Sequence, residues 1–380
     1  MTKPVQGRPR TLEDAKHWMR GRIASRTHPM NLVEPSIANA VIDQLAALDG
    51  ENWASAWGSA ASRMRAEARA AAAHGELAAA TKVLQAHGLY FLGRFPSPNH
   101  PKKLECARLK RETYLEAAQY FSVPVSRVSV PFRGREGEGT EVVFLYRRPP
   151  QVEHPPVVVM WGGVDAWKEQ MTQASDALLA KGIATVALDS PGTGESPVLG
   201  SVDAERQFLP VLDWIAAQPD LWGERVGCLG RSFGGYWATK LAHLYRERIA
   251  GAVNWGGGVH RMFQRDWIEA SRYPDSYLME LVETRRRMLG AKNEADYIAF
   301  YQRLSLVDQG ILELPCAPLL LVNGKDDRQC PIEDLFLLTE HGSPKTVRLF
   351  PGGHMGHTPR TLPAIVEWLV AQVLSQGNRR

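Results

Sequence analysis

The sequence predicts an α/β protein in which a helical domain precedes a doubly wound, mostly parallel β-sheet. The chain has 380 residues, more than the roughly 100 to 200 of a typical single domain. Its first third is rich in Ala, Leu, Glu and Arg at helical spacing, whereas the remainder alternates short apolar runs with helical segments. Apolar strands between helices are typical of a parallel sheet that helices cover on both faces.

The predicted domain boundaries follow these changes along the chain. Residues 1–124 are expected to form an N-terminal helical domain, and residues 125–258 and 315–380 the two parts of the α/β core. Residues 259–314 separate two predicted strands, although a plain crossover needs only about a dozen residues or more. We therefore expect them to form a helical lid inserted into the core.

Composition and charge exclude several classes of protein. With 44% hydrophobic and 23% charged residues, the chain has an ordinary globular composition, and its net charge of +4 does not argue for nucleic-acid binding. The four cysteines form no CxxC pair, and neither an apolar leader nor a membrane-spanning run of about 18 residues is present. We expect a cytoplasmic protein without membrane or nucleic-acid partners.

The helical first third is predicted from composition and from its breaks. Helices are expected over residues 35–119, interrupted at Asp49-Gly50, at His74-Gly75 and in a Pro-containing loop at 97–101. These helical layers offer a surface for a possible homodimer.

Eight short β-rich runs are predicted after residue 124. Two of them, joined by a Gly-rich loop, are expected to form a hairpin, and six continuous apolar runs are expected to form the parallel strands. The hairpin strands are 127–132 and 141–147, and the apolar runs are 155–163, 183–192, 225–235, 249–257, 317–327 and 346–354.

The lid contains a run of three arginines, Arg285, Arg286 and Arg287. We interpret it as the solvated face of a helix, with an anion site as the alternative.

A nucleophile motif follows the predicted strand that begins at Arg225. Residues 230–234 read Gly-Arg-Ser-Phe-Gly, which matches G-x-S-x-G between a strand and a helix. In a nucleophile elbow the serine occupies a strained turn, and the flanking glycines avoid collisions with neighbouring backbone. Ser232 is therefore the candidate nucleophile.

An acid and a base are expected after later strands, because a serine hydroxyl needs a base and the base needs an orienting group. Asp327 lies three residues past Gly324 and four before Pro331, so it is preferred over Asp326. Two histidines follow the last strand, and His354, directly after a glycine pair, is preferred over His357.

Two backbone amides are candidates for stabilising negative charge on a carbonyl oxygen under attack. One belongs to Phe233, which follows the nucleophile, and the other to Gly163 or Val164, in the turn after the first apolar run.

Four further side chains are candidates for the substrate pocket, because they lie near predicted strand ends or at the start of the lid. They are Trp161, Glu195, Trp255 and His260. The sequence contains no HExxH, GxGxxG or Walker loop, so we expect neither a metal nor a cofactor.

The core resembles the α/β-hydrolase superfamily, and within it the branch of dihydroxypseudooxynicotine hydrolase, the fungal polyketide-shortening hydrolases and the fermentation-respiration switch esterases. The stretches that carry the resemblance are VVVMWGGVDAWKEQ, ALDSPGTGES, GCLGRSFGGYWATKLA and AVNWGG. The resemblance implies a helical domain over the core, and several members cleave a carbon–carbon bond next to a ketone. It also implies Ser232 as nucleophile, His354 as base and Asp327 as its orienter, whereas Trp161 and Phe233 depart from some relatives.

The predicted function is that of a serine hydrolase acting on a small ketone- or ester-bearing molecule through an acyl-enzyme. The resemblance favours carbon–carbon hydrolysis of a 1,3-dicarbonyl compound, with carboxylester hydrolysis as the alternative. A hydrolase-fold protein that only binds a ligand is a third hypothesis. A peptidase of the prolyl oligopeptidase type is disfavoured, because the first third is predicted to be helical and not a β-propeller.

Overall fold

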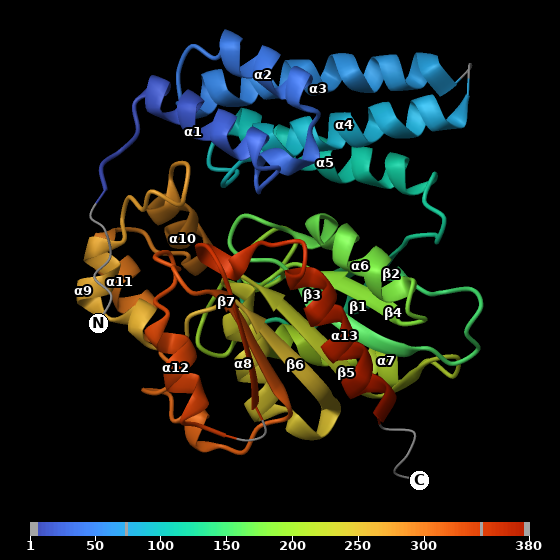
Figure 1. The fold of residues 1–380 in the computed structure, drawn as a ribbon, viewed down its shortest axis with the longest axis vertical. Helices are drawn as coiled ribbons and strands as arrows, with labels where there is room; N and C mark the ends of the chain where they lie inside the picture. Colours follow the sequence, from blue (N-terminus) through green and yellow to red (C-terminus); the bar gives the residue numbers. More distant parts are fainter. Residues whose placement is uncertain (1–6, 73–74, 343–344, 376–380) are drawn as a thin grey trace. The chain divides into compact units, whose positions relative to one another are not determined.

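The computed structural model describes residues 7–72, 75–342 and 345–375, and the chain divides into two compact units (Figure 1). The sheet unit comprises residues 126–276 and 285–380 together with the first seven residues. The helical unit comprises residues 8–125 and 277–284.

Five α-helices make up most of the helical unit. Three of them begin where the sequence favours a helix start: Thr11 forms a capping box with Asp14 before α1, and a proline opens both α2 and α5. The predicted break at Asp49-Gly50 is confirmed, whereas His74 of the second predicted break lies outside the described residues. The helices are α1 (Leu12–Ala24), α2 (Pro35–Gln44), α3 (Gly50–Ala72), α4 (Glu76–Arg94) and α5 (Pro101–Ala118).

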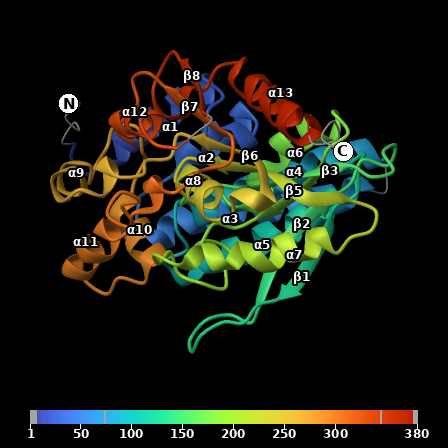
Figure 2. The same ribbon diagram turned by 90° about the horizontal axis from the view of Figure 1, so that it is seen from below.

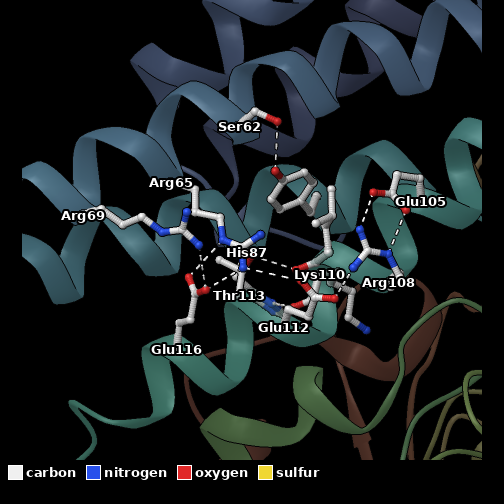
Figure 3. A network of polar contacts seen from close by, with 12 residues as sticks. Ser62, Arg65, Arg69, His87, Glu105, Arg108, Lys110, Glu112, Thr113 and Glu116 are labelled. Atoms are coloured by element: carbon white, nitrogen blue, oxygen red, sulfur yellow. Dashed lines mark hydrogen bonds and ion pairs between the residues drawn. The ribbon is translucent and has the colours of Figure 1, made fainter.

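Polar contacts join α3, α4 and α5 (Figure 3). The same helices also share a buried apolar cluster. The Arg65 guanidinium donates to both carboxylate oxygens of Glu116, at 3.0 and 2.5 Å. Ser62 and Tyr90 share a hydrogen bond of 2.9 Å between α3 and α4. Because a paired, planar guanidinium fixes direction as well as distance, these contacts set how the helices align.

The sheet unit is built on eight strands in the described part of the chain, in the order β1-β2-β4-β3-β5-β6-β7-β8. Strand β2 pairs antiparallel with both of its neighbours, β1 and β4, and the remaining neighbours pair in parallel. The predicted hairpin and the predicted mostly parallel sheet are therefore confirmed. The strands are β1 (Ser126–Pro131), β2 (Glu141–Arg147), β3 (Pro156–Trp161), β4 (Ala184–Leu188), β5 (Trp222–Arg231), β6 (Ile249–Trp255), β7 (Leu319–Gly324) and β8 (Lys345–Phe350).

Helices cover both faces of this sheet (Figure 2). On one face α6 (Thr172–Leu179) contacts α13 (Thr361–Leu374), and on the other α7 (Leu209–Ala216) and α8 (Gly234–Leu244) contact β5. Every residue of β3, β4, β6 and β7 is buried, as a sheet covered twice requires. Gly227 of β5 leaves room for α13, because a Cβ there would lie 3.1 Å from Val373 and 3.3 Å from Leu369.

The segment between β6 and β7 is helical, as predicted for the lid. It contains α9 (Arg265–Ala270), α10 (Leu281–Leu289) and α11 (Glu294–Gln302). In the described part of the chain, no helix has both the length and the apolar character needed to cross a membrane.

The interpretation of the three arginines as one solvated face is wrong for the first of them. Arg285 is only 4% exposed, whereas Arg286 is half-buried and Arg287 is exposed. Helical spacing explains the difference, because Met288 and Leu289, three and four residues further along, are also buried.

A single buried carboxylate anchors the beginning of the lid segment. Asp334, in α12 (Glu333–Thr339), accepts hydrogen bonds from four consecutive backbone N–H groups at distances of 2.6 to 3.2 Å. The donors belong to residues 259–262. Without this carboxylate, four N–H groups would lose their partner.

We expect Asp334→Ala to lower the free energy of unfolding by about 3 kcal/mol, because buried donors left without an acceptor each cost about 1 to 3 kcal/mol. Urea unfolding followed by circular dichroism measures the change. The control is Glu340→Ala, at an exposed position just after the same helix. Equal stability of the two variants would contradict the anchoring role.

Candidate active site

Ser232 occupies the sharp turn between β5 and α8. Its φ is 55°, in the left-handed region that side chains other than glycine rarely adopt. Two close approaches explain the glycines on either side: a Cβ at Gly230 would lie 2.1 Å from the oxygen of Gly234, and one at Gly234 would lie 2.4 Å from the oxygen of Gly162. The predicted elbow geometry is therefore present at Ser232.

The predicted acid and base lie together with Ser232 at the carboxyl ends of three parallel strands. The distance from Ser232 Oγ to His354 Nε2 is 2.8 Å, and that from His354 Nδ1 to Asp327 Oδ2 is also 2.8 Å. Asp327 follows β7 and His354 follows β8. Ser232 and His354 are 122 positions apart in the sequence, and His354 and Asp327 are 27 apart. The three side chains nevertheless form one chain of hydrogen bonds.

Asp327 is 1% exposed, and its second oxygen is satisfied by backbone N–H groups. Oδ1 accepts from Gln329 N at 2.8 Å and Cys330 N at 3.1 Å. Oδ2 accepts from Asn323 Nδ2 at 2.9 Å as well as from the imidazole. A carboxylate held in this way fixes the imidazole with its Nδ1 proton toward Asp327, which leaves Nε2 able to accept the serine proton.

The sequence analysis did not identify Asn323. This residue joins the loop after β7, which carries Asp327 (the acid loop), to the loop after β8, which carries His354 (the base loop). Its Nδ2 donates to Asp327, and its Oδ1 accepts from Met355 N at 2.9 Å. The signal was an amide residue at the end of an apolar strand, one position before Gly324.

The charge on His354 depends on two opposing effects. Burial lowers the pKa of the imidazole, but the Asp327 carboxylate, with a smaller contribution from Cys330, outweighs it and raises that pKa above the ordinary 6.5. When His354 takes up a proton, it forms an ion pair with Asp327, and this ion pair favours the protonated imidazole.

Gly163 lies directly against the serine. A Cβ at this position would be 2.9 Å from Ser232 Cβ, 3.1 Å from its Oγ and 3.3 Å from Phe233 N. The neighbouring Gly162 oxygen accepts from Ser190 Oγ at 2.6 Å. The turn after β3 therefore leaves open space on the same side of Ser232 as the Phe233 amide.

A buried ion cluster ties this turn to the loop after β4. Lys168 Nζ lies 2.6 Å from Asp189 Oδ2 and 2.7 Å from Glu195 Oε2. Asp189 also accepts from the backbone N–H groups of Lys168 and Glu195, each at 2.8 Å. Glu195 pairs with Arg127 as well, at 3.0 Å, so this predicted pocket residue is held by two cations.

The two tryptophans predicted for the pocket donate hydrogen bonds to the elbow and to the loop after β8. Trp161 is fully buried, and its Nε1 donates to the oxygen of Gly234 at 2.8 Å, beneath the elbow. Trp255 Nε1 donates to the oxygen of Met355 at 2.7 Å, in the base loop.

The remaining predicted pocket residue, His260, lies at the start of the lid segment. Its Nδ1 is 2.7 Å from Ser305 Oγ. The alternative base, His357, packs its ring 5.5 Å from the Trp255 ring.

Aromatic side chains from the lid pack beside the elbow. The ring of Phe233 stacks with Tyr301 at 6.2 Å and an interplanar angle of 20°, and Phe263 meets both rings edge-on. Neither Tyr301 nor Phe263 was identified from the sequence. Helical periodicity predicts which face of a helix packs on the core, but not which strand end that face contacts.

One group of side chains could hold a metal ion among the described residues. The possible ligand atoms of Asp327, Cys330 and His354 lie within 4.8 Å of one another. A metal bound there would replace the contact between His354 and Asp327, so it would compete with the hydrogen-bonded chain to Ser232.

The chain is similar in sequence to known proteins that are named as esterases or hydrolases. The sequence profile described as esterase FrsA-like matches residues 20–373. The chain is 32% identical over 151 residues to 2,6-dihydropseudooxynicotine hydrolase from Paenarthrobacter nicotinovorans, covering 39% of each chain. It is 28% identical over 262 residues to esterase FrsA from Pectobacterium atrosepticum, covering 67% of this chain and 61% of the relative. The matched part thus spans 39% and 61% of the lengths of these two relatives.

Solved structures show the same fold over most of the chain. The crystal structure of 2,6-dihydroxy-pseudo-oxynicotine hydrolase has a TM-score of 0.77 at 22% identity and covers 94% of this chain and 96% of its own. A structure of AbyA5 has a TM-score of 0.72 at 22% identity, covering 97% and 95%. The predicted α/β-hydrolase fold is confirmed.

We expect Asp327→Asn to lower the pKa of His354, because the carboxylate that opposes the effect of burial is then removed. Titration of the 15N-labelled imidazole by NMR measures the change, with Asp326→Asn, an exposed neighbour, as control. The raised pKa also contributes stability below pH 6.5, which is lost as the pH rises through the raised value. An unchanged pKa in Asp327→Asn would contradict the coupling.

Proposed function

The chain belongs to the esterase FrsA-like family, and on that premise we propose that it is a serine hydrolase that cleaves a small ketone- or ester-bearing molecule through an acyl-enzyme. The observation that carries the proposal is the hydrogen-bonded chain from Ser232 through His354 to Asp327. No other group is needed for the first proton transfer, because the serine hydroxyl already lies against the imidazole.

In the proposed first step His354 Nε2 accepts the proton of Ser232 while Oγ attacks the substrate carbonyl. The negative oxygen of the tetrahedral intermediate would be stabilised by the amide of Phe233 and by that of Gly163 or Val164. The close approach of Gly163 to Ser232 supports this placement, since any larger residue would occupy the space that the carbonyl needs.

In the second half His354 returns the proton to the leaving group and then activates a water molecule that hydrolyses the acyl-enzyme. Asp327 stabilises the imidazolium that forms in each half. No cofactor takes part in this sequence.

The broken bond is proposed to be a carbon–carbon bond of a 1,3-dicarbonyl compound. A carbon leaving group departs as a carbanion that a neighbouring ketone stabilises and that must be protonated at once, which favours a water-poor, aromatic site. Phe233, Phe263 and Tyr301 supply such a wall beside the elbow. The relative from P. nicotinovorans is named a hydrolase, and the resemblance of the core to its branch favours this reaction.

Carboxylester hydrolysis is the second candidate, and the family description favours it. An alkoxide leaving group needs only the proton of His354, so the same Ser232 chain serves. A protein that only binds its ligand is disfavoured, since binding alone does not require a buried carboxylate behind His354.

We expect the protein to hydrolyse 1-phenyl-1,3-butanedione, and Ser232→Ala to lower turnover by about 10⁴-fold or more. Products identified by mass spectrometry show which bond breaks, and p-nitrophenyl butyrate tested in parallel reports esterase activity. Turnover of the ester alone would identify an esterase.

Asp327→Asn serves as a second variant in that assay and should reduce turnover by about 10⁴-fold with the fold intact. Full activity of either variant on both compounds would refute the assigned chain, and inactivity of the unaltered protein on both would favour the binding protein.

Gly163→Ala is expected to lower kcat by about 10²-fold, because its methyl group would fill the space beside Ser232 Oγ and the Phe233 amide. The matched control is Gly21→Ala, in a helix where an added Cβ meets nothing within 4 Å. Steady-state kinetics on whichever compound is turned over provide the measurement. Equal kcat values for the two variants would move the oxyanion site away from residue 163.

A further inference from the structure

One arginine of the lid is buried without a described acidic residue to neutralise it. Arg285 is 4% exposed, and among the described residues no Asp or Glu forms an ion pair with it. Other buried cations of this chain do have carboxylate partners: Lys168 lies 2.6 Å from Asp189, and Lys240 lies 3.0 Å from Glu205. Burying an uncompensated charge is costly, and guanidinium does not escape the cost by losing its proton.

Two phenol groups share the surroundings of this guanidinium. Arg285 Cζ lies 5.0 Å from the centre of the Tyr301 ring, and Tyr297, whose ring centre is 5.6 Å from that of Tyr301, is also close to the charge. The hydroxyl groups of both tyrosines are buried, and neither makes a well-aligned hydrogen bond to another described residue. The Tyr297 oxygen is also within hydrogen-bonding reach of the Arg285 guanidinium. Buried polar groups nearly always have partners, so a buried cation without a carboxylate, beside two phenols that can still donate, indicates a missing acceptor.

The cluster lies next to the proposed reaction centre. On one side the Tyr301 ring stacks on Phe233, the residue after the nucleophile. On the other side Arg285 is within electrostatic reach of Cys330, whose Sγ lies within 4.8 Å of a His354 ring nitrogen. The cluster is thus connected to the elbow through Phe233 and to His354 through Cys330.

We propose that Arg285, Tyr297 and Tyr301 bind a carboxylate of the substrate, at a distance from the carbonyl that Ser232 attacks. This inference rests on the proposed function and adds a substrate class: small keto acids or acid esters with a remote carboxylate. A guanidinium matches the two oxygens of a carboxylate, and phenols can donate to the remaining lone pairs. One positive charge balances a carboxylate, whereas a phosphate dianion would leave a buried negative charge.

Selectivity between substrates follows from the cost of leaving the buried Arg285 charge without a negative partner. A neutral substrate of the same shape would leave the buried guanidinium without a negative partner and both phenol protons without an acceptor. Sites built to hydrogen-bond a substrate group discriminate strongly against analogues that lack it. The chain should therefore prefer the acid over its neutral analogue.

The test compares mono-p-nitrophenyl adipate with p-nitrophenyl hexanoate, which differ only by a terminal carboxylate in place of a methyl group. We expect kcat/KM to be higher for the adipate ester, and Arg285→Gln to lower the adipate-to-hexanoate ratio by about 10²-fold. The matched control is Arg287→Gln, at an exposed position of the same helix, which should keep the ratio of the unaltered protein. A ratio that Arg285→Gln leaves unchanged would overturn the proposal.

Calorimetric binding of adipate to Ser232→Ala separates this inference from the proposed function. Binding that is lost in the double variant with Arg285→Gln supports the subsite even if no ester or diketone is hydrolysed. Absence of adipate binding to a folded Ser232→Ala protein overturns it, whatever the esterase assay shows. If Arg285→Gln fails to fold, Tyr297→Phe and Tyr301→Phe take its place, and each should weaken adipate binding while thermal unfolding stays cooperative.

Discussion

The left-handed backbone of Ser232 is the constraint on which the candidate site depends. A φ of 55° turns the chain from β5 into α8 within one residue and projects the hydroxyl from the end of the sheet. The turn is so tight that Gly230 and Gly234 cannot carry a Cβ. Strain of this kind persists only where the surroundings hold it. Here Ser232 N donates to the oxygen of Trp255 at 2.7 Å, so the neighbouring strand β6 fixes the turn.

Each loop that faces Ser232 is fastened by a buried polar group instead of by apolar packing alone. Asp189 joins the turn after β3 to the loop after β4, and Asn323 joins the acid loop to the base loop. Asp334 holds the first residues of the lid segment. Since irregular loops lack the regular hydrogen bonding of helices and strands, such carboxylate and amide bridges are what can hold them to fractions of an ångström.

Sequence reasoning predicted the sheet and the three central residues because both depend on local patterns. Apolar runs gave the strands, and the spacing around Ser232, Asp327 and His354 reflects where each strand ends. The remaining features depend on tertiary packing. Arg285 was assigned to solvent because three successive arginines are usually hydrated, yet helix geometry turns the first of them inward beside Met288. No local sequence pattern predicts that Tyr301 of the lid contacts Phe233.

The buried polar groups of the sheet unit fall into two kinds, and the difference has a chemical meaning. Asp327 and the Lys168 cluster are satisfied within the protein, so they are complete before any substrate arrives. Around Arg285, by contrast, no described Asp or Glu pairs with the guanidinium, and the hydroxyl protons of Tyr297 and Tyr301 have no acceptor among the described residues. Satisfied groups hold machinery that serves either an ester or a ketone, because attack by Ser232 is common to both. In the proposed subsite the groups around Arg285 are completed by the bound carboxylate, so the proposal assigns the choice of substrate to the lid.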